Sequence, residues 1–423
     1  MMNIFSAKSK TKKQKITDLK DPAVFRVPLL QHIGNAAEPV VSAGDAVKRY
    51  QLIGRANGPV SANVHSPVSG VVIGIRECPL ADGQIVPAIE IENDFKYTEL
   101  EHPDSDLEKL SGKDILEIIE EAGVVGEGGA GFPTHVKYDV KDKKIKTFIL
   151  NGTECEPYLT SDYSLIDQFP SRLIIGALLI NKILKAEEII IAIEHQNKDL
   201  VGKLHELINK PENKAFKIKI LPDQYPQGGE LQLIKSLTGI EVKRGGLPAD
   251  KGVIVSNVGT VIAVFNAVAR HKPLVERVIT VSGDNLQGAG NYMVKIGTPV
   301  SHIVEVLGLD VQKQIVLGGP MMGKQVTNFS VPIQKGSSAV LSFQAKVVQY
   351  TNCISCGYCV DICPMRLMPF KFAEYFRKEM YASMKTYNLN ECIECAACQY
   401  ICPCNVPLME SIKNGKAELN KFK

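Results

Sequence analysis

Two stretches of the sequence read Cys353-Ile-Ser-Cys-Gly-Tyr-Cys-Val-Asp-Ile-Cys-Pro364 and Cys392-Ile-Glu-Cys-Ala-Ala-Cys-Gln-Tyr-Ile-Cys-Pro403. Every cysteine of the second stretch follows its counterpart in the first by 39 residues, so the pattern is an internal duplication. Nine of the eleven cysteines lie between Cys353 and Cys404. Because a disulfide framework spreads its cysteines along a small secreted chain, this clustering within 423 residues indicates metal binding instead.

The spacing Cys-x-x-Cys-x-x-Cys-x-x-x-Cys-Pro is that of bacterial ferredoxins with two [4Fe–4S] clusters. Three closely spaced thiolates on a tight loop reach three irons of a cubane, and the fourth cysteine, beside a proline, ligates the other cluster. The pattern therefore predicts two crossed ligand sets. The first set is Cys353, Cys356, Cys359 and Cys402, and the second is Cys392, Cys395, Cys398 and Cys363. Because crossed ligation ties the two runs together, we expect this module to fold only with iron.

Structural zinc is the alternative interpretation of the cysteine runs. Zinc sites pair two short Cys-x-x-Cys hooks across a longer loop, which three evenly spaced cysteines followed by Cys-Pro match poorly. Cys404 and the isolated Cys78 are interpreted as buried free thiols without a ligand role. Since paired cubanes carry single electrons and perform no chemistry on an organic substrate, another part of the chain must exchange electrons with them.

The overall composition bounds the class of protein. With 45% hydrophobic and 22% charged residues the chain can form real cores, and its length predicts about three domains. A net charge of +3 is too balanced to indicate nucleic acid or a polyanionic substrate. The longest apolar stretch, 173–184, is too short to span a bilayer, and no signal-peptide core precedes the lysine-rich start. We therefore expect a soluble, multidomain protein that is not exported.

The first 20 residues are predicted to form a flexible basic tail. Five lysines and no acidic residue occur within residues 1–17. Like charges repel one another and such a segment buries little apolar surface, which favours a solvated tail. The alternative is contact with an anionic membrane surface, to which each basic residue adds about 1 kcal/mol.

The rest of the chain divides into four predicted modules. Residues 21–100 are β-rich and turn-punctuated, 101–245 alternate helices with strands, 246–345 form a small α+β module, and 346–423 carry the cysteines. Buried strands are predicted at 145–150, 189–193 and 216–221, and helices near 114–122, 170–184, 198–209, 228–237 and 369–387. Strands that alternate with helices indicate a parallel sheet covered on both faces.

A glycine-rich loop, Gly126-Glu-Gly-Gly-Ala-Gly-Phe-Pro-Thr134, precedes the first of these strands. It contains a literal G-x-G-x-x-G, but a helical pattern stands before it where the dinucleotide fingerprint requires a strand. We therefore reject the standard Rossmann fingerprint. A loop rich in glycine still lets backbone N–H groups approach a phosphate or a flat ring closely.

The loop resembles the flavin loop of the NADH-binding subunit of respiratory complex I. The next strand runs into Asn151-Gly-Thr-Glu-Cys-Glu-Pro157, which is similar to the Asn-Ala-Asp-Glu-Gly-Glu-Pro loop of that family. The family's Tyr-x-x-Gly-Glu-Glu is matched by Tyr225-Pro-Gln-Gly-Gly-Glu230, and its Asn-Val-x-Thr by Asn257-Val-Gly-Thr260. The resemblance implies a Rossmann-like parallel α/β flavin domain.

The N-terminal module adds a second resemblance. Its halves, 41–47 and 64–72, are similar to the two arms of a lipoyl-like barrel-sandwich hybrid. The hairpin between the arms, 55–63, contains no lysine, so a covalently loaded swinging arm is not expected. Such a hybrid before the flavin core and two ferredoxin runs after it resemble the RnfC family of the Rnf electron transport complex. This branch implies a β-grasp-like (SLBB) module at 246–345 and a ferredoxin-like α-helical domain at the end.

The resemblance also implies a set of cofactor-binding residues. Non-covalent FMN would lie against the glycine loop, with other side chains at its phosphate, ribityl group or ring edge, and NAD(H) would bind beside it as substrate. The FMN residues would be Gly126, Gly128, Gly129, Lys137, Asn151, Glu154, Tyr225 and Asn257. Phe132 would stack on the nicotinamide or adenine ring, and Glu156 and Glu230 would hydrogen-bond the nucleotide.

Three positions depart from the complex I pattern. Glu127 stands where complex I has an arginine that pairs with phosphate, Thr153 where it has Asp, and Gly229 where it has Glu. These departures change the expected nucleotide geometry more than the flavin assignment.

The function implied is that of a peripheral electron-transfer subunit of an ion-translocating ferredoxin:NAD+ oxidoreductase. It would act on the cytoplasmic side of the cell membrane with integral membrane partners, and would exchange electrons with ferredoxin through the complex. No membrane span is predicted, so ion pumping is not expected to reside in this chain. Two alternatives stay open: a flavin and iron–sulfur cobalamin reductase of a propanediol-utilising compartment, and an electron-relay or scaffold subunit that binds no nucleotide.

Overall fold

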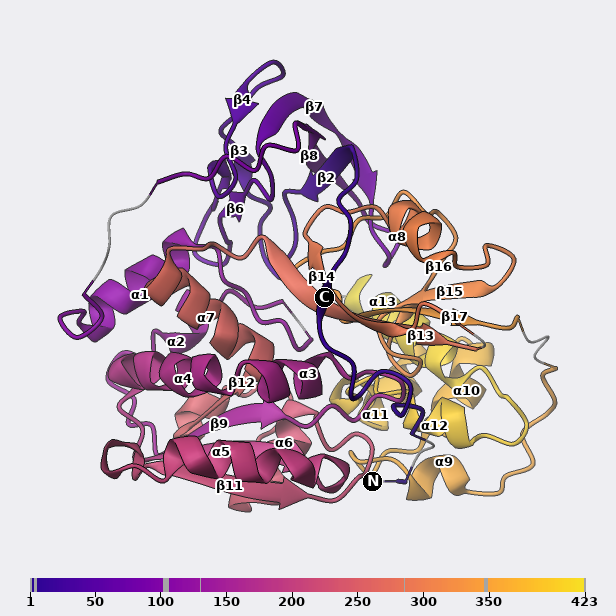
Figure 1. Cartoon of the computed structure of the whole chain (residues 1–423). Coiled ribbons are helices and arrows are strands. Elements are labelled where there is room, and N and C mark those ends of the chain that lie inside the picture. The colour runs from indigo at the N-terminus through magenta and orange to yellow at the C-terminus, as the bar shows by residue number, and fades with distance from the viewer. Residues whose placement is uncertain are drawn as a thin grey trace.

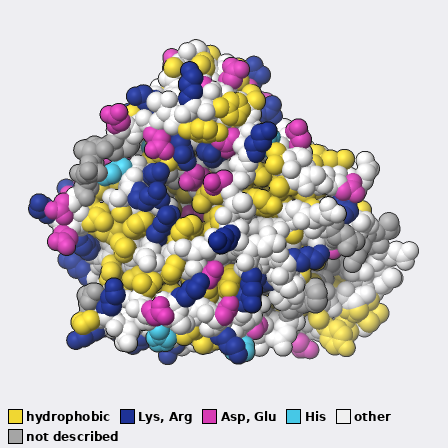
Figure 2. All heavy atoms as spheres, viewed as in Figure 1, with side chains coloured by type: hydrophobic (Ala, Val, Ile, Leu, Met, Phe, Trp, Pro, Cys, Tyr) yellow, Lys and Arg dark blue, Asp and Glu magenta, His cyan; other side chains and the backbone are white. Residues whose placement is uncertain are grey.

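The computed structural model describes residues 2–3, 6–101, 106–129, 131–284, 286–345 and 349–421. Figure 1 shows four parts: a β-rich module at the top, an α/β domain at the lower left, a mixed sheet at the right and a helical module at the lower right. Figure 2 shows acidic and basic side chains interspersed over the viewed face, as expected for a net charge of only +3.

The N-terminal module is built from two small sheets that enclose a shared core. Phe25, Val27, Ile89 and Ile91 are all fully buried in this core, and they alternate with outward-facing residues along two paired strands. One sheet has the order β2 (Val24–Pro28), β8 (Ile85–Asn93), β7 (Gly70–Pro79) and β4 (Ala46–Val47), and the other β3 (Glu38–Pro39), β5 (Leu52–Arg55) and β6 (Val64–His65). This arrangement fits the predicted barrel-sandwich hybrid.

The α/β domain contains the predicted parallel sheet. Its order is β11 (Phe216–Leu221), β10 (Glu188–Glu194), β9 (Thr147–Gly152) and β12 (Val253–Asn257), all parallel. Apolar side chains alternate between the two faces: Phe148 and Leu150 point into the main core, and Ile149 points to the opposite face. The main core packs α1 (Gly112–Glu121), α4 (Pro170–Leu184), α5 (Val201–Ile208) and α7 (Val258–Arg270), and α6 (Glu230–Thr238) covers the other face. Both faces are therefore covered, as parallel sheets require.

The predicted boundary at residue 245 is misplaced. Strand β12 pairs with β9 along its whole length, from Val253 opposite Thr147 to Asn257 opposite Asn151. Helix α7, which follows directly, packs against α4 in the same core. Residues 253–270 therefore belong to the α/β domain, because the sheet needs its fourth strand to cover the edge of β9.

The mixed sheet joins segments from both ends of the chain. Its order is β1 (Thr17–Asp18), β14 (Gly290–Lys295), β13 (Glu276–Gly283), β17 (Ala339–Phe343), β15 (Gln314–Leu317) and β16 (Lys324–Val326). Helix α8 (Val300–Leu307) packs on it through Val300, Ile303 and Val304. The sheet thereby borders the α/β domain along β13.

The prediction of a flexible tail over residues 1–20 is wrong for the described part of that segment. Residues 2–3 and 6–18, here called the N-terminal strap, lie against the folded chain. Met2 forms a two-way backbone bridge with Tyr225, and β1 adds as a parallel strand to β14. Lys8 and Thr11 are only 5% and 0% exposed. Charge repulsion does not keep the strap in solvent, because polar partners from other modules satisfy its buried groups.

The C-terminal module repeats a loop and a short helix. Each cysteine run ends in such a helix, α9 (Tyr358–Asp361) and α12 (Ala397–Ile401), which contact each other. The longer helices α10 (Pro369–Arg377), α11 (Tyr381–Thr386) and α13 (Leu408–Lys421) complete it, with Phe372, Met384 and Ile412 in its core. Among the residues described, no helix combines the length and the apolar character needed to cross a membrane.

Candidate cofactor sites

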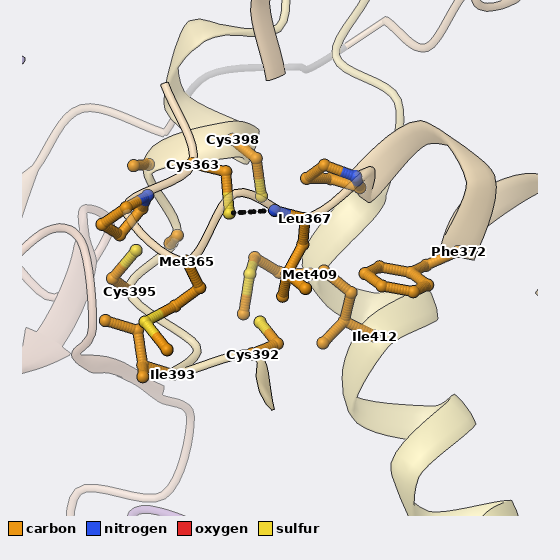
Figure 3. Close-up of a pocket in the computed structure, with 14 residues that line it drawn as sticks. Cys363, Met365, Leu367, Phe372, Cys392, Ile393, Cys395, Cys398, Met409 and Ile412 are labelled. Atoms are coloured by element: carbon orange, nitrogen blue, oxygen red, sulfur yellow. Dashed lines mark hydrogen bonds between the residues drawn. The ribbon is translucent and has the colours of Figure 1, made fainter. Parts of the chain in front are cut away.

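One hollow in the C-terminal module is lined by four cysteines taken from both runs. Cys392, Cys395 and Cys398 come from the second run, and Cys363 comes from the first. Figure 3 shows the four sulfur atoms around the space, with apolar side chains such as Met409 beside them. The hollow encloses about 340 Å³ and is here called the inner hollow.

A second hollow has the complementary lining. Cys353, Cys356 and Cys359 of the first run face Cys402 of the second across about 620 Å³. It is here called the outer hollow, because Cys353 and Cys356 are exposed to solvent whereas Cys395 and Cys398 of the inner hollow are buried. Cys404, interpreted as a buried bystander, is buried and also lines this hollow.

Both hollows suit four-thiolate cubane clusters. Each thiolate of a cubane binds a different iron, so the ligands surround the cluster without converging on one ion. Within the ranges that the structure describes, no three His, Cys, Asp or Glu side chains are grouped to hold a single metal ion. Burial raises the pKa of the Cys395 thiol to about 11 and also raises that of Cys392. Loading with iron, which binds thiolates, therefore releases protons.

Backbone N–H groups point at three cysteine sulfurs. Leu367 N lies 3.4 Å from Cys363 Sγ, drawn as a dashed line in Figure 3. Ser355 N lies 3.4 Å from Cys353 Sγ, and Glu394 N lies 3.4 Å from Cys392 Sγ. Hydrogen bonds to ligand sulfurs are one of the means by which a protein tunes a cluster's potential.

The predicted flavin residues meet at the carboxyl edge of the parallel sheet. Asn151 and Asn257 stand opposite each other in register at the ends of β9 and β12. The glycine loop packs on Asn257 so closely that a Cβ added to Gly128 would lie 2.8 Å from Asn257 Cβ. At Gly129, by contrast, no described atom lies within 4 Å of an added Cβ. The loop is therefore packed on one side and open on the other, which fits a flat cofactor laid over its backbone.

The N-terminus of α7 adds an anion-binding feature to this edge. Asn257 caps the helix by accepting a hydrogen bond of 2.8 Å from Gly259 N, and its Nδ2 donates to Asp162 Oδ2 at 2.7 Å. Unpaired N–H groups at a helix start favour phosphate. On the rim, Lys137 pairs with Glu230 at 2.8 Å, so these two predicted residues are brought together. Phe132 is half-buried, and its carbonyl accepts from Gly126 N.

Four buried charged groups lie behind the glycine loop. Arg277 of β13 is 3.8 Å from the Glu127 carboxylate, and both side chains are 5% exposed. Glu154 Oε1 accepts hydrogen bonds from the Ser161 hydroxyl and Asp162 N, whereas its Oε2 is buried without a hydrogen-bond partner among the described residues. Burial, reinforced by the charge of Glu154, raises the pKa of Asp162 to about 8. No sequence motif marks Asp162 or Arg277, because their place at this edge depends on distant chain segments meeting.

Two predicted ligands are engaged by other modules instead of facing this edge. The Glu156 carboxylate accepts 2.9 Å hydrogen bonds from Met321 N and Met322 N, in the turn between β15 and β16. The Tyr225 hydroxyl donates to Cys395 O at 2.6 Å, at the wall of the inner hollow. The predicted nucleotide role of Glu156 and ribityl role of Tyr225 are therefore not supported by these contacts.

We expect Glu156→Gln to flatten a pH dependence of stability. Burial raises the pKa of Glu156 to about 7, against an ordinary value of 4.5. A raised folded-state pKa means that stability is fully present below the ordinary value and is lost as pH rises through 7. Relative to the variant, the natural protein should lose roughly 3 kcal/mol between pH 4.5 and 8. Chemical denaturation followed by flavin fluorescence at both pH values measures this, with the exposed Glu305→Gln as control; an equal pH slope in both chains would contradict it.

We expect Tyr225→Phe to weaken the contact between the flavin edge and the inner hollow. The change leaves the Cys395 carbonyl without its donor, at a cost of about 1–3 kcal/mol for a buried acceptor. Denaturation should show this loss, and rapid-mixing reduction should show slower appearance of a reduced cluster. The exposed Tyr400→Phe in α12 serves as control. Unchanged stability and rate would sink the prediction.

A parallel sheet with an open glycine loop at its carboxyl edge, joined to a module with two four-thiol hollows, defines a flavin and iron–sulfur electron-transfer protein. Three family models match the chain: the RnfC barrel sandwich hybrid domain at residues 2–96, the Nuo51 FMN-binding domain at 119–266, and a 4Fe-4S dicluster domain at 352–406. The chain thus carries an FMN-binding domain and a dicluster domain, as predicted.

Curated relatives agree over most of the chain, and all three described here are the C component of their complex. That of the proton-translocating ferredoxin:NAD(+) oxidoreductase complex of Clostridium ljungdahlii is 41% identical, covering 86% of this chain and 81% of that protein. Its counterpart in the Na(+)-translocating complex of Acetobacterium woodii is 38% identical, covering 95% and 92%. The counterpart in the ion-translocating oxidoreductase complex of Rhodobacter capsulatus is 39% identical, covering 97% and 80%. The chain belongs to the RnfC family of ion-translocating oxidoreductase complexes.

Among solved structures, an NAD+-reducing [NiFe]-hydrogenase in the H2-reduced state has a TM-score of 0.51 and 22% sequence identity. The match covers 74% of this chain and 54% of the hydrogenase chain. At this identity the likeness concerns the fold alone.

Proposed function

We propose that this chain is the electron-transferring subunit of a ferredoxin:NAD+ oxidoreductase complex, passing electrons between NAD(H), FMN and two [4Fe–4S] clusters. The names of its relatives in Clostridium ljungdahlii and Acetobacterium woodii support the complex and the reaction. A flavin exchanges electrons in pairs with a nicotinamide and singly with a cluster, so it belongs between the two. The chain's own residues would bind and orient the cofactors and exclude water.

The contact between the flavin edge and the inner hollow is the observation that carries this proposal. Three segments of the α/β domain reach the C-terminal module: Tyr225 donates to Cys395 O, Arg244 donates to Asn390 O at 2.8 Å, and Gln232 Nε2 lies 3.4 Å from Met365 Sδ. Met365 and Cys395 both line the inner hollow. A direct protein contact of this kind would let an electron pass from one cofactor to the next without crossing solvent.

The same contact orders the path. We place FMN first, the cluster of the inner hollow second and the cluster of the outer hollow third. The outer hollow suits the exit because Cys353 and Cys356 are exposed, as are Ile354 and Tyr358 beside them. The next electron carrier would dock at this surface, on another protein of the complex. Membrane association, on the cytoplasmic side, would come through the integral membrane partners.

The residues proposed to hold FMN are those that gather at the strand edge. They are Gly126, Gly128, Gly129, Lys137, Asn151, Glu154 and Asn257. We keep Phe132 and Glu230 as the proposed nucleotide contacts at the rim. The proposed cluster ligands are the four cysteines of each hollow, in the crossed arrangement.

An anaerobic NADH titration tests the proposal. The purified protein, reconstituted with iron, sulfide and FMN, should show bleaching of the flavin absorbance followed by EPR signals of two reduced clusters. Flavin bleaching without any reduced cluster would contradict the path, and failure of NADH to bleach the flavin would favour a relay that binds no nucleotide. Co-purification with integral membrane proteins, rather than reduction of a corrinoid, separates this function from a cobalamin reductase.

A further inference from the structure

The N-terminal strap crosses the carboxyl edge of the parallel sheet, where FMN is proposed to bind. At one end, Met2 exchanges backbone hydrogen bonds with Tyr225, which itself reaches Cys395. At the other end, β1 pairs with β14 of the mixed sheet. Thr11, between them, receives a 2.8 Å hydrogen bond from the Thr160 hydroxyl, and its carbonyl accepts from Asn291 Nδ2 at 3.1 Å. The strap is therefore held at several points that do not involve Lys8.

Among the described residues of the strap, Lys8 is the only buried cation. Its ammonium donates to the backbone carbonyl of Glu154 and lies 3.5 Å from Glu194 Oε2. Glu194 is the last residue of β10, and Glu154 lies in the loop that follows β9. One ammonium therefore links the ends of two adjacent strands at the flavin edge, with Lys8 5% and Glu194 1% exposed.

The two contacts of Lys8 have different physical roles. The contact with Glu194 compensates a buried carboxylate, whose pKa is raised by burial and lowered by Lys8. The hydrogen bond to the Glu154 carbonyl fixes a backbone peptide and carries no compensating charge on the loop. Because Glu154 is a proposed FMN residue, that hydrogen bond holds the loop in its binding conformation.

We propose that Lys8 is a positioning residue for the FMN site, acting through its hydrogen bond to the backbone of the 153–156 loop. This inference rests on the proposed function of the flavin edge. The rival explanation is that Lys8 only neutralises Glu194 and so contributes to stability alone.

A double-variant experiment separates the two explanations. Lys8→Met removes both contacts, Glu194→Gln removes only the buried charge, and the double variant removes the ammonium without leaving an unpaired carboxylate. Lys10→Met is the matched control, because Lys10 is on the same strap and exposed. For each reconstituted protein we would measure the thermal midpoint, the FMN dissociation constant by flavin fluorescence, and amide hydrogen exchange at residues 153–156.

Lys8→Met should lower the thermal midpoint, raise the FMN dissociation constant about tenfold and speed exchange in the 153–156 loop. The double variant should regain most of the thermal midpoint but keep the weak FMN binding and the fast exchange. Lys10→Met should match the natural protein in all three measurements.

Recovery of tight FMN binding in the double variant would overturn the positioning role and support charge compensation. Tight FMN binding in Lys8→Met would overturn it as well. If the natural protein itself took up no FMN, both the proposed function and this inference would fall. A defect confined to the variants bears on Lys8 alone.

Discussion

Cys402→Ala should remove the cluster of the outer hollow and leave that of the inner hollow in place. Cys402 belongs to the second cysteine run in the sequence, yet it lines the outer hollow with Cys353, Cys356 and Cys359. Its loss takes away the fourth thiolate, so iron should fall from about eight to about four atoms per chain. Iron and acid-labile sulfide assays measure the loss, and EPR of the reduced protein identifies the cluster that remains.

The control lies two residues away. Cys404→Ala should keep both clusters, because Cys404 belongs to neither proposed ligand set although it lines the same hollow. The spectrum of Cys402→Ala should match that of Cys353→Ala, whereas Cys363→Ala should match Cys392→Ala. If Cys402→Ala instead matched Cys392→Ala, each run would serve its own cluster and the crossed arrangement would be wrong.

Gly128→Ala should abolish or strongly weaken FMN binding. The added Cβ would meet Asn257 Cβ at 2.8 Å, a separation at which one of the two must shift. Asn257 cannot give way freely, since its side chain caps α7 and donates to Asp162. The glycine loop should therefore move off the strand edge, and we expect the FMN dissociation constant to rise at least about tenfold, the cost of roughly 1.4 kcal/mol or more.

The comparison within the same loop is Gly126→Ala. Its added Cβ would lie 3.7 Å from the nearest atoms of Phe132, which is ordinary van der Waals contact. We expect it to bind FMN nearly as well as the natural protein, measured by fluorescence titration and by flavin content after gel filtration. Equal losses in both variants would mean that general loop flexibility, and not packing on Asn257, governs the site.

Much of the fold could be predicted because its signals are local. The strands at 147–152 and 188–194 are short, almost continuously apolar runs, and the helix that starts at Pro170 carries its own start signal. The two cysteine runs have spacings that few structures other than paired cubanes require. The glycine loop and Asn257 can be found through motif resemblance, and the structure brings them into contact.

The features that the sequence did not predict have a common cause. A run of lysines is polar and predicts a solvated strap, but burial of Lys8 depends on Glu154 and Glu194, which lie far away in the sequence. The predicted domain boundary is misplaced because β12 follows a stretch of short elements, and only its pairing with β9 reveals its sheet.

The chemistry of this protein can be recognised without its structure: the spacing of thiols predicts paired clusters, the glycine loop a flavin, and the strand and helix periods the module between them. Which residues share a site depends on how the modules pack. The motif resemblance assigns Tyr225 to the flavin, but its hydroxyl lies at the inner hollow, Glu156 is held by the turn at 321–322, and Lys8 joins two strand ends. The reason is physical: spacing and periodicity act over a few residues, whereas burial of a charge or a hydroxyl is satisfied by whichever distant group the packing of the modules brings within hydrogen-bonding distance.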